Sequence, residues 1–209
     1  MRDLRRARAR MVVRQIKARG VANPAVLAAM CAVERHRFVL DGDAGEAYAD
    51  HPLAIGHGQT ISQPYVVAFM TEALGLGGGE KVLEVGTGSG YQTAVLAALG
   101  CEVFSIEIVP ELARRAQGIL DELGVRARVR IGDGALGWPE EAPFDAILVA
   151  AAPARVPPTL VSQLAPRGRM VLPIGDEHQE LHLLRRTADG HDEEKLLAVR
   201  FVPMTGSAG

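Results

Sequence analysis

The sequence has few aromatic side chains, few cysteines and no long apolar run. Aromatic residues make up 4% of the 209 positions, which disfavours a protein that stacks single-stranded bases on exposed rings. The only two cysteines, Cys31 and Cys101, form neither a disulfide framework nor a zinc-binding pattern, so a reducing compartment is favoured. No stretch approaches the roughly 18 apolar residues of a membrane span, and the first residues lack the apolar run of a signal peptide. We therefore expect a cytoplasmic protein without a membrane partner.

The remaining composition is that of a globular protein with an uneven distribution of charge. Apolar residues make up 48% and charged residues 23%, and the length favours a single domain, residues 1–209. Residues 1–20 carry eight basic side chains and one acidic, a charge of +7, whereas the other 189 residues carry 15 basic and 24 acidic, a charge of −9. A basic end can be a tail for nucleic acid. The acidic remainder and the shortage of aromatics favour instead a solvated helix face, with no nucleic-acid partner.

Apolar spacing and capping residues predict helices before residue 76. Apolar side chains recur at helical spacing near the start, and Gly20 is a plausible end to that helix. Asn23 and Pro24 are typical of a helix start. A later stretch is rich in Gly, Asp, His and Pro with little periodicity, which indicates a long functional loop. The predicted elements are helices over 2–19, 24–33 and 65–75, and a loop over 41–64.

From Lys81 onward, short runs rich in Val and Ile alternate with helix-like stretches. This alternation predicts βαβ units and a parallel sheet covered on both faces. The last two runs have no helix between them and flank an Asp-Gly turn, which predicts an antiparallel pair. The predicted strands are 81–85, 102–107, 127–131, 144–150, 169–174, 180–186 and 195–204, and the helices are 89–99, 110–123 and 157–164. The expected fold is α/β: a Rossmann-like, doubly wound, mostly parallel seven-stranded sheet with an antiparallel C-terminal hairpin and N-terminal helices.

A glycine-rich loop, Gly86-Thr87-Gly88-Ser89-Gly90, joins the first of these strands to the next helix. Such glycines allow a tight turn and a close approach of backbone to a nucleotide, although a βα turn without ligand is the alternative. The dinucleotide pattern G-x-G-x-x-G fails here, because Tyr91 or Thr93 stands where the last glycine belongs. A phosphate loop fails too, because it needs a Lys directly after its last glycine, and the sequence has no Lys between Lys81 and Lys195.

Acidic residues surround this loop, and they favour a cationic nucleotide ligand. Glu84 precedes the loop, where a carboxylate would repel a pyrophosphate and attract a cation. S-adenosylmethionine, with its sulfonium and ammonium groups, fits this pattern. Glu107 ends the second strand and can accept hydrogen bonds from ribose hydroxyls. Asp133, followed by Gly134 after the third strand, can accept from an adenine amino group.

Several motifs together resemble the protein-L-isoaspartate O-methyltransferase family of class I methyltransferases. They are EVGTGSGYQTAVLA, GHGQTISQPYVVAFM, FDAILVAAAP, GRMVLPIGDEHQELHLLRR and VRFVPMTG. TISQP is the most specific of them, because a generic methyltransferase has no reason to carry it. The resemblance implies a repair enzyme that methylates the free α-carboxylate of L-isoaspartyl residues with S-adenosylmethionine. The ester then closes to a succinimide, which partly opens to aspartate.

The resemblance also assigns roles to single residues. Ser62 matches the active-site serine, and the loop residues match the part that holds the methionine end of the cofactor. Glu107 matches the ribose-binding acid and Asp133 with Gly134 the adenine-side turn. The complete expectation is Ser62 as catalytic residue, Glu84, Gly86, Thr87, Gly88, Ser89, Glu107, Asp133 and Gly134 for the cofactor, and Thr60, Ile61, Ser62, Tyr65 and Thr205 for the substrate. The roles of His57, Tyr65 and Thr205 stay open.

The chemistry of this reaction agrees with what the sequence carries. A substrate carboxylate with a pKa near about 4 is ionised at neutral pH, so no general base is required. We expect Ser62 to orient that carboxylate by a hydrogen bond, or else to cap the helix that begins near Pro64. His178, Glu180 and His182 share one strand face, but a hairpin surface is favoured over a metal site. No metal is therefore expected.

Residues 1–75 are expected to carry the N-terminal helices and the active-site loop, and residues 76–209 the cofactor-binding core. The expected partners are isoaspartyl peptides and proteins, and the expected state is a monomer. Three other functions stay open: another class I methyltransferase, a nicotinamide-dependent oxidoreductase, and a nucleic-acid-binding protein that uses the basic helix.

Overall fold

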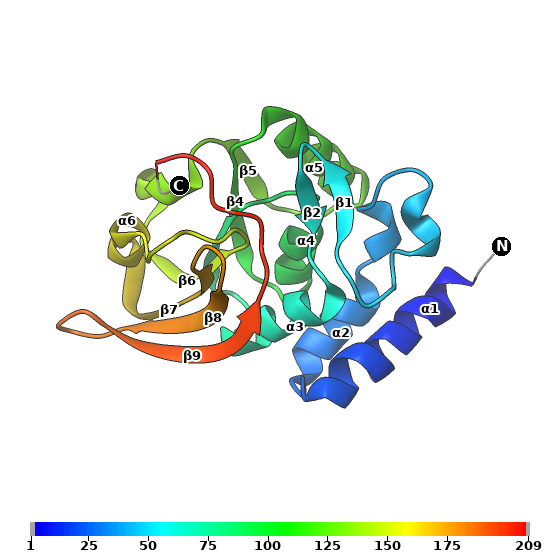
Figure 1. The fold of residues 1–209 in the computed structure, drawn as a ribbon, viewed down its shortest axis with the longest axis horizontal. Helices are drawn as coiled ribbons and strands as arrows, with labels where there is room; N and C mark the ends of the chain where they lie inside the picture. Colours follow the sequence, from blue (N-terminus) through cyan, green and yellow to red (C-terminus); the bar gives the residue numbers. More distant parts are fainter. Residues whose placement is uncertain (1–2, 208–209) are drawn as a thin grey trace.

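A computed structural model describes residues 3–207. The chain begins with a continuous helical segment, made of α1 (Leu4–Met11), a π-helical turn (Val12–Ile16) and a 3-10 turn (Lys17–Arg19). Gly20 ends it with φ of 101°, a left-handed conformation that glycine adopts without strain. The predicted helix over 2–19 is thus confirmed within the described residues. Figure 1 shows this segment at one end of the molecule.

Two further helices follow the predicted pattern closely. Helix α2 (Pro24–Ala32) has Asn23 as its N-cap, and the side-chain oxygen of Asn23 accepts from the amide of Ala25 at 2.9 Å. Helix α3 spans Pro64–Ala73. Short 3-10 turns at Arg35–Arg37 and Asp43–Gly45 connect α2 to the next segment.

The expectation of a long loop over 41–64 is wrong toward its C-terminal end. Strands β1 (Leu53–Gly56) and β2 (Gln59–Ile61) pair antiparallel there as a small hairpin. Its turn runs through Gly56, His57 and Gly58, all with positive φ, which permits a tight reversal. The strands are too short, and their register too irregular, for apolar periodicity to reveal them.

Seven strands form the central sheet in the order β5-β4-β3-β6-β7-β8-β9. All neighbours pair parallel from β5 to β7, and β8 pairs antiparallel with both β7 and β9. This confirms the predicted fold class. The strands are β3 (Lys81–Val85), β4 (Glu102–Glu107), β5 (Arg128–Ile131), β6 (Phe144–Val149), β7 (Leu164–Ile174), β8 (Gln179–Arg186) and β9 (His191–Val199).

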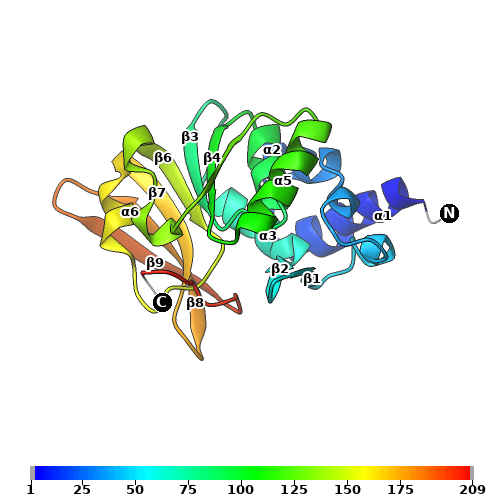
Figure 2. The same cartoon turned by 90° about the horizontal axis from the view of Figure 1, so that it is seen from above.

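Helices α4 (Tyr91–Ala98), α5 (Pro110–Glu122) and α6 (Pro158–Ser162) connect the parallel strands. Figure 2 shows α6 on one side of the sheet and α2, α3 and α5 on the other, with α1 beyond them. Residues alternate between these two sides along each strand. Within β3, for example, Leu83 packs with Phe104 and Phe144, whereas Val82 packs with Met70 and Leu96.

The last strand lies earlier in the sequence than predicted. β9 starts at His191 and not at residue 195. The acidic residues before position 195 belong to the strand, because they pair with basic side chains of β8. Glu194 lies 2.8 Å from Arg185, and the ammonium of Lys195 lies 2.6 Å from Glu180. Both pairs are diagonal neighbours in the β8–β9 register, where long side chains of opposite charge still reach one another and stabilise the strand pair. The chain therefore leaves the sheet at Val199, and residues 200–207 are free to cross the ends of other strands.

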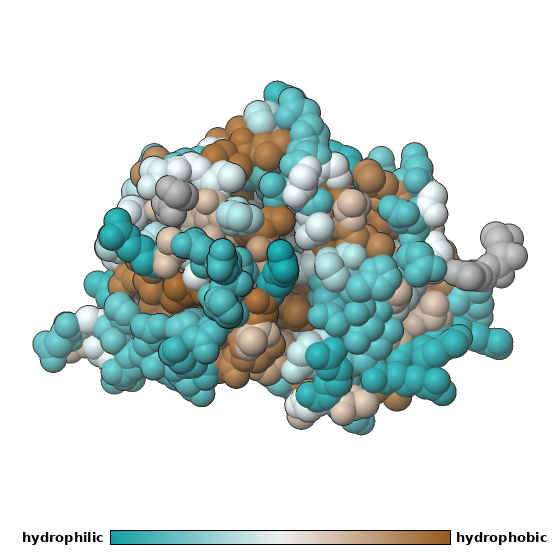
Figure 3. Space-filling view, viewed as in Figure 1, coloured by the Kyte–Doolittle hydropathy of each residue, from teal (hydrophilic) through white to brown (hydrophobic). Residues whose placement is uncertain are grey.

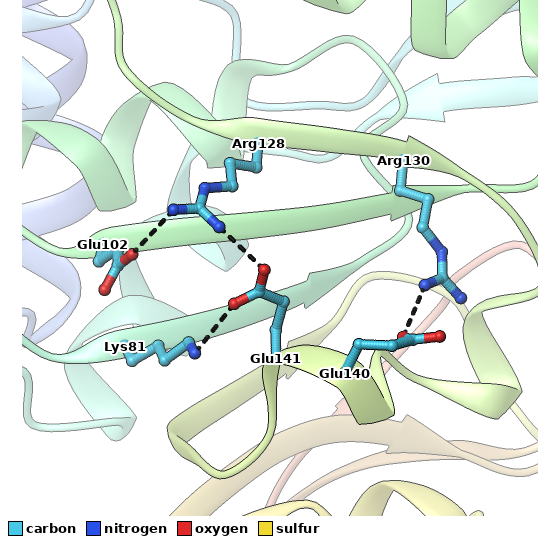
Figure 4. A network of polar contacts seen from close by, with 6 residues as sticks. All are labelled: Lys81, Glu102, Arg128, Arg130, Glu140 and Glu141. Atoms are coloured by element: carbon cyan, nitrogen blue, oxygen red, sulfur yellow. Dashed lines mark hydrogen bonds and ion pairs between the residues drawn. The ribbon is translucent and has the colours of Figure 1, made fainter.

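A charged network covers the opposite edge of the sheet (Figure 4). Glu141, in a 3-10 turn at Pro139–Glu141, contacts Lys81 at 3.2 Å and Arg128 at 2.9 Å. Arg128 also reaches Glu102 at 3.8 Å, and Arg130 pairs with Glu140 at 3.0 Å. Charged side chains on an edge strand discourage pairing with another chain.

Within residues 3–207, none of the helices is long and apolar enough to cross a bilayer.

Candidate active site

The main cleft lies at the carboxyl ends of the parallel strands, where β3 and β6 are neighbours. The order of strands reverses there, since connections run from β3 outward to β5 and then back to β6. Ligands of open α/β sheets bind at such a switch point. Most of its lining residues come from six places: Thr60, Ile61 and Ser62 at the end of β2; Gly86, Thr87, Gly88 and Ser89 after β3; Ile106, Glu107 and Ile108 at the end of β4; Gly134 after β5; Ala150 and Ala151 after β6; and Val202, Met204 and Thr205 after β9.

The glycine loop forms the floor of this cleft. Gly86, Gly88 and Gly90 all have positive φ, which lets the chain turn sharply from β3 into α4. The amide of Gly86 donates to the carbonyl of Ile106 at 2.8 Å, so the loop is tied to β4. A Cβ on Gly88 would come within 3.4 Å of Ile55, because the β1–β2 hairpin lies directly over the loop.

Glu107 is the only charged residue that lines the cleft in the described part of the chain. Its side chain is 6% exposed. One carboxylate oxygen accepts from the amide of Gly88 at 2.7 Å and the other from the amide of Val109 at 3.0 Å. Each oxygen keeps a second acceptor position for a ligand. The cleft is therefore negative and offers acceptors, and it suits a cationic or hydroxyl-bearing ligand better than a phosphate.

Glu84 lies outside the cleft, so the expected direct contact with a cofactor is corrected. Side chains alternate along β3, and Glu84 falls on the side that faces α4. It is fully buried. Its Oε2 accepts from the hydroxyls of Thr93 at 2.5 Å and Ser105 at 2.7 Å. Since Ser105 gives its proton to Glu84, Thr87 donates to Ser105, at 2.5 Å. Glu84 thus supports the glycine loop from beneath through Ser105 and Thr87.

Burial raises the pKa of Glu84 to about 7. Hydrogen bonds from Thr93 and Ser105 lower this pKa in part, and the charge of Glu107 raises it further. Oε1 of Glu84 is buried without a hydrogen-bond partner among the described residues. A buried carboxylate with one unsatisfied oxygen prefers to be protonated, so the charge of Glu84 changes close to neutral pH.

Asp133 holds the C-terminal segment and is not among the residues that line the cleft, so its expected role as an adenine acceptor gains no support from this arrangement. Its carboxylate accepts from the amide of Ala135 at 2.9 Å, and from both the amide and the hydroxyl of Ser207 at 2.8 and 2.7 Å. Burial alone would raise the pKa of Asp133, but the bonds from Ser207 and Ala135 outweigh it and lower the pKa. Gly134 does line the cleft, and a Cβ there would lie 2.4 Å from Val85.

Ser62 has a free hydroxyl at the edge of the cleft. It is half-buried and makes no hydrogen bond with any of the described residues. The alternative that Ser62 caps helix α3 is wrong, because Gln63 occupies the N-cap position and no side chain caps that helix. Thr60 is exposed beside it, whereas Ile61 is buried. The guanidinium of Arg115 holds this hairpin in place by donating to the carbonyl of Ile55 at 3.0 Å.

A second hollow adjoins the cleft, and Thr60, Ser62, Ala150 and Val202 line both. We call it the arginine groove, because Arg19 and Arg200 line it. Tyr65, Val66, Leu197 and Phe201 are among its other lining residues. Tyr65 is therefore near Ser62 but belongs to this groove and not to the main cleft. His57 is exposed at the hairpin turn and lines neither hollow.

The segment after β9 crosses the end of β6 and closes one side of the cleft. The amide of Ala152 donates to the carbonyl of Val202 at 2.9 Å, and the amide of Met204 donates to the carbonyl of Ala152 at 2.7 Å. This anchoring places Thr205, which is exposed, on the lining of the cleft.

Some lining residues were missed from the sequence. Ala150 and Ala151 directly follow strand β6, and Gln92 lies in the first turn after the glycine loop, so their places beside a parallel strand end could have indicated them. Arg19 carries no such signal, because it lies in the basic N-terminal segment. Of the three metal-ligand candidates, His178 lies just before β8, whereas Nε2 of His182 lies 3.9 Å from Glu180 and Nδ1 of His182 bonds to Glu193 of β9. No cluster of three such ligands occurs in residues 3–207.

Comparisons with known proteins point to one family. The family model for protein-L-isoaspartate(D-aspartate) O-methyltransferase matches residues 7–209. A protein-L-isoaspartate O-methyltransferase of Gloeobacter violaceus is 57% identical over 198 residues, covering 93% of this chain and 97% of the relative. One from Anaeromyxobacter dehalogenans is 62% identical over 191 residues, covering 89% and 91%.

Solved structures agree with these relatives. A protein-L-isoaspartate O-methyltransferase superposes with a TM-score of 0.90 at 28% identity, over 97% of this chain and 67% of that chain. A Plasmodium falciparum structure described as a putative protein-L-isoaspartate O-methyltransferase, in complex with S-adenosyl-L-homocysteine, superposes with a TM-score of 0.81 at 26% identity. That match covers 93% of this chain and 96% of the other.

Proposed function

Since the chain belongs to the protein-L-isoaspartate(D-aspartate) O-methyltransferase family, we propose a role for each part of its cleft in the reaction of that family. The enzyme is an S-adenosylmethionine-dependent repair methyltransferase. It methylates the free α-carboxylate of L-isoaspartyl residues in damaged proteins, and the ester leads through a succinimide to aspartyl. One observation supports the assignment of the active site most strongly. The free hydroxyl of Ser62 lies where the cofactor cleft and the arginine groove meet.

The cleft suits S-adenosylmethionine by its glycine backbone and by the charge of its lining. Gly86 and Gly88 form a cradle without side chains, and a Cβ on Gly86 would come within 3.5 Å of Ala150. Glu107, as the only charged lining residue described, complements a positive ligand. A nicotinamide dinucleotide would bring a pyrophosphate to a cleft with no basic lining residue among those described, which disfavours the oxidoreductase alternative. S-adenosylmethionine, when bound, supplies a methyl group on a positively charged sulfur.

We propose that the glycine loop residues Gly86, Thr87, Gly88 and Ser89 hold the methionine end of the cofactor. The second acceptor positions of Glu107 accept from the two ribose hydroxyls. Gly134, which lines the cleft beside Val85, leaves room for the adenine ring. Glu84 and Asp133 act indirectly, through residues that they hold in place. Glu84 fixes the loop through Ser105, and Asp133 fixes the C-terminal segment through Ser207.

Ser62 orients the substrate carboxylate. The carboxylate is already ionised at neutral pH, so the residues around it need only align it and exclude water. The hydroxyl of Ser62 has no competing partner among the described residues and is free to donate to that carboxylate. Thr60, Ile61 and Thr205 complete the walls on either side. Tyr65 contributes to the adjacent groove, where the peptide on either side of the isoaspartyl residue binds.

We also propose a division of labour along the chain. Residues 1–75 supply Arg19, the hairpin and Ser62 to the substrate side. Residues 76–209 supply the cofactor side and, through the segment after β9, the other wall of the substrate side. A single chain provides both sides of the cleft, which supports action as a monomer. The basic helix packs its apolar residues Met11 and Ile16 into the body, which supports a structural role for that helix and no nucleic-acid partner.

Substitution of Ser62 tests the assignment. A hydrogen bond to a charged group is worth about 1.5–3 kcal/mol, so Ser62→Ala should lower kcat on an isoaspartyl peptide about tenfold to a hundredfold. The dissociation constant of S-adenosylhomocysteine, measured by calorimetry, should change less than about twofold. Ser162→Ala is the matched control, because the Ser162 hydroxyl bonds only within its own helix, to Thr159. Wild-type turnover by Ser62→Ala would refute the role of this hydroxyl.

A further inference from the structure

The arginine groove differs in charge from the cleft beside it. Its described lining contains two arginines, Arg19 and Arg200, and no acidic residue. The neighbouring cleft has the reverse composition, with Glu107 as its only charged lining residue among those described. The groove has a volume of about 450 Å³, within the range of about 300–1,000 Å³ that is typical of ligand sites. In Figure 3, apolar surface lies between the hydrophilic surfaces of β9 and of the N-terminal helices.

Arg19 is held in place before any substrate arrives. Its guanidinium carbon lies 3.6 Å from the centre of the Tyr65 ring, a cation–π contact. Asp50 lies 3.2 Å from one guanidinium nitrogen and itself accepts from the side-chain amide of Gln63 at 2.8 Å. A guanidinium carries five N–H donors, and these contacts leave most of them available. The side chain of Arg19 is 43% exposed.

Arg200 comes from the other wall. It directly follows β9, at the start of the segment that crosses to Thr205. Its side chain is exposed and makes no ion pair or hydrogen bond with the described residues 3–207. All residues from Leu197 to Val202 line the groove, and Val202 lines the cleft as well. A chain that places one residue at Ser62 therefore places its neighbours between two cations.

We propose that the arginine groove makes the enzyme prefer isoaspartyl residues that are flanked by acidic side chains. This rests on the proposed position of the substrate at Ser62. A carboxylate beside the isoaspartyl residue meets the guanidinium of Arg19 or Arg200, while apolar parts of the peptide pack on Val66, Leu197 and Phe201. Like charges disfavour basic flanks for the same reason. The preference selects among damaged sites and leaves the methyl transfer itself unchanged.

Three isoaspartyl peptides of equal length test this preference. They carry two Glu, two Gln or two Lys residues on each side of the isoaspartyl residue. For exposed charge pairs, we expect kcat/KM for the Glu peptide to exceed that for the Gln peptide about three- to tenfold, with the Lys peptide below both. Between ionic strengths of about 0.02 and 0.3 M the ratio should fall toward one, because salt screens exposed charges.

Charge reversal separates a direct effect from a structural one. Arg200→Glu should lose the preference for the Glu peptide and improve kcat/KM for the Lys peptide, a gain that a misfolded groove would not produce. Arg19→Lys, which keeps the charge but not the planar stack on Tyr65, should retain most of the Glu-to-Gln ratio. Arg126→Gln is the matched control: Arg126 is an exposed arginine next to β5, at the opposite edge of the sheet, and its loss should leave the ratio unchanged.

The outcomes distinguish this inference from the function on which it rests. Methylation of all three peptides with equal kcat/KM at low salt would overturn the charge preference and leave the repair activity intact. An unchanged ratio in Arg200→Glu would overturn it as well. Methylation of none of the peptides would instead contradict the proposed function, and the groove would then have no substrate to select.

Discussion

Glu84→Gln removes a titration that the structure places in the middle of the protein. Burial raises the pKa of Glu84 from 4.5 to about 7. The folded state therefore binds its proton more tightly than the unfolded state does. Below the unfolded pKa the group is protonated in both states and has no effect. As pH rises from 4.5 through about 7, the unfolded state releases its proton first and stability is lost.

The magnitude follows from the two pKa values. A shift of one unit corresponds to about 1.4 kcal/mol, so ionised Glu84 destabilises the fold by about 3 kcal/mol once the pH exceeds the folded pKa. Between pH 5 and pH 8, wild type should lose about 2–3 kcal/mol from this group. Glutamine has a similar shape, can accept from Thr93 and Ser105, and does not titrate. All other groups titrate alike in both proteins, so the difference between the two pH profiles isolates Glu84.

Urea unfolding at pH 5 and pH 8, followed by circular dichroism, measures this difference. The drop in free energy of unfolding from pH 5 to pH 8 should be about 2–3 kcal/mol larger for wild type than for Glu84→Gln. High salt should change this difference little, because the carboxyl group is fully buried. Equal drops in the two proteins would refute a shifted Glu84, and with it the account of the polar support beneath the glycine loop.

Three further substitutions test separate contacts. Gly134→Ala places a Cβ 2.4 Å from Val85, and overpacking of this kind should lower the free energy of unfolding by about 1–3 kcal/mol in urea titrations; unaltered stability contradicts the close approach. Arg115→Gln removes the bond to the Ile55 carbonyl, so the hairpin loosens and KM for peptide should rise severalfold, while an unchanged KM means that the hairpin needs no such anchor. Glu141→Gln should lower the free energy of unfolding by less than about 1 kcal/mol, and by less still in high salt, because its partner Arg128 is 60% exposed. A loss of stability that salt does not reduce would contradict a screened surface network.

Local signals were sufficient wherever the fold depends on neighbours in sequence. Asn23 caps its helix, Gly20 ends another, and the glycines after β3 turn the chain sharply into α4 through their positive φ angles. The strand alternation gave the parallel sheet because each βαβ unit is nearly self-contained. Glu107 lies in the cleft because it ends β4 beside the glycine loop.

Local sequence patterns did not predict the contacts between segments that are distant in the sequence. Asp133 is occupied by Ser207, which lies 74 residues further along the chain, and no local pattern around Asp133 indicates that contact. Glu84 lies one residue before the end of β3. It contacts Thr93 of α4 and not the ligand site because its side chain is on the face of the sheet that α4 covers, and the local sequence does not reveal which face that is. The strands of the hairpin at residues 53–61 are too short for an alternation of apolar and polar residues to be recognised in the sequence. Arg19 reaches the groove only because the N-terminal helices pack beside α3.

The measurement that tests the central claim most directly uses two peptides of one sequence, one with an isoaspartyl and one with an aspartyl residue. The purified enzyme is incubated with each and with S-adenosylmethionine labelled in its methyl group. We predict that label enters the isoaspartyl peptide as a base-labile ester and that the aspartyl peptide stays essentially unlabelled. Equal labelling of the two peptides, or labelling of neither, would contradict the account.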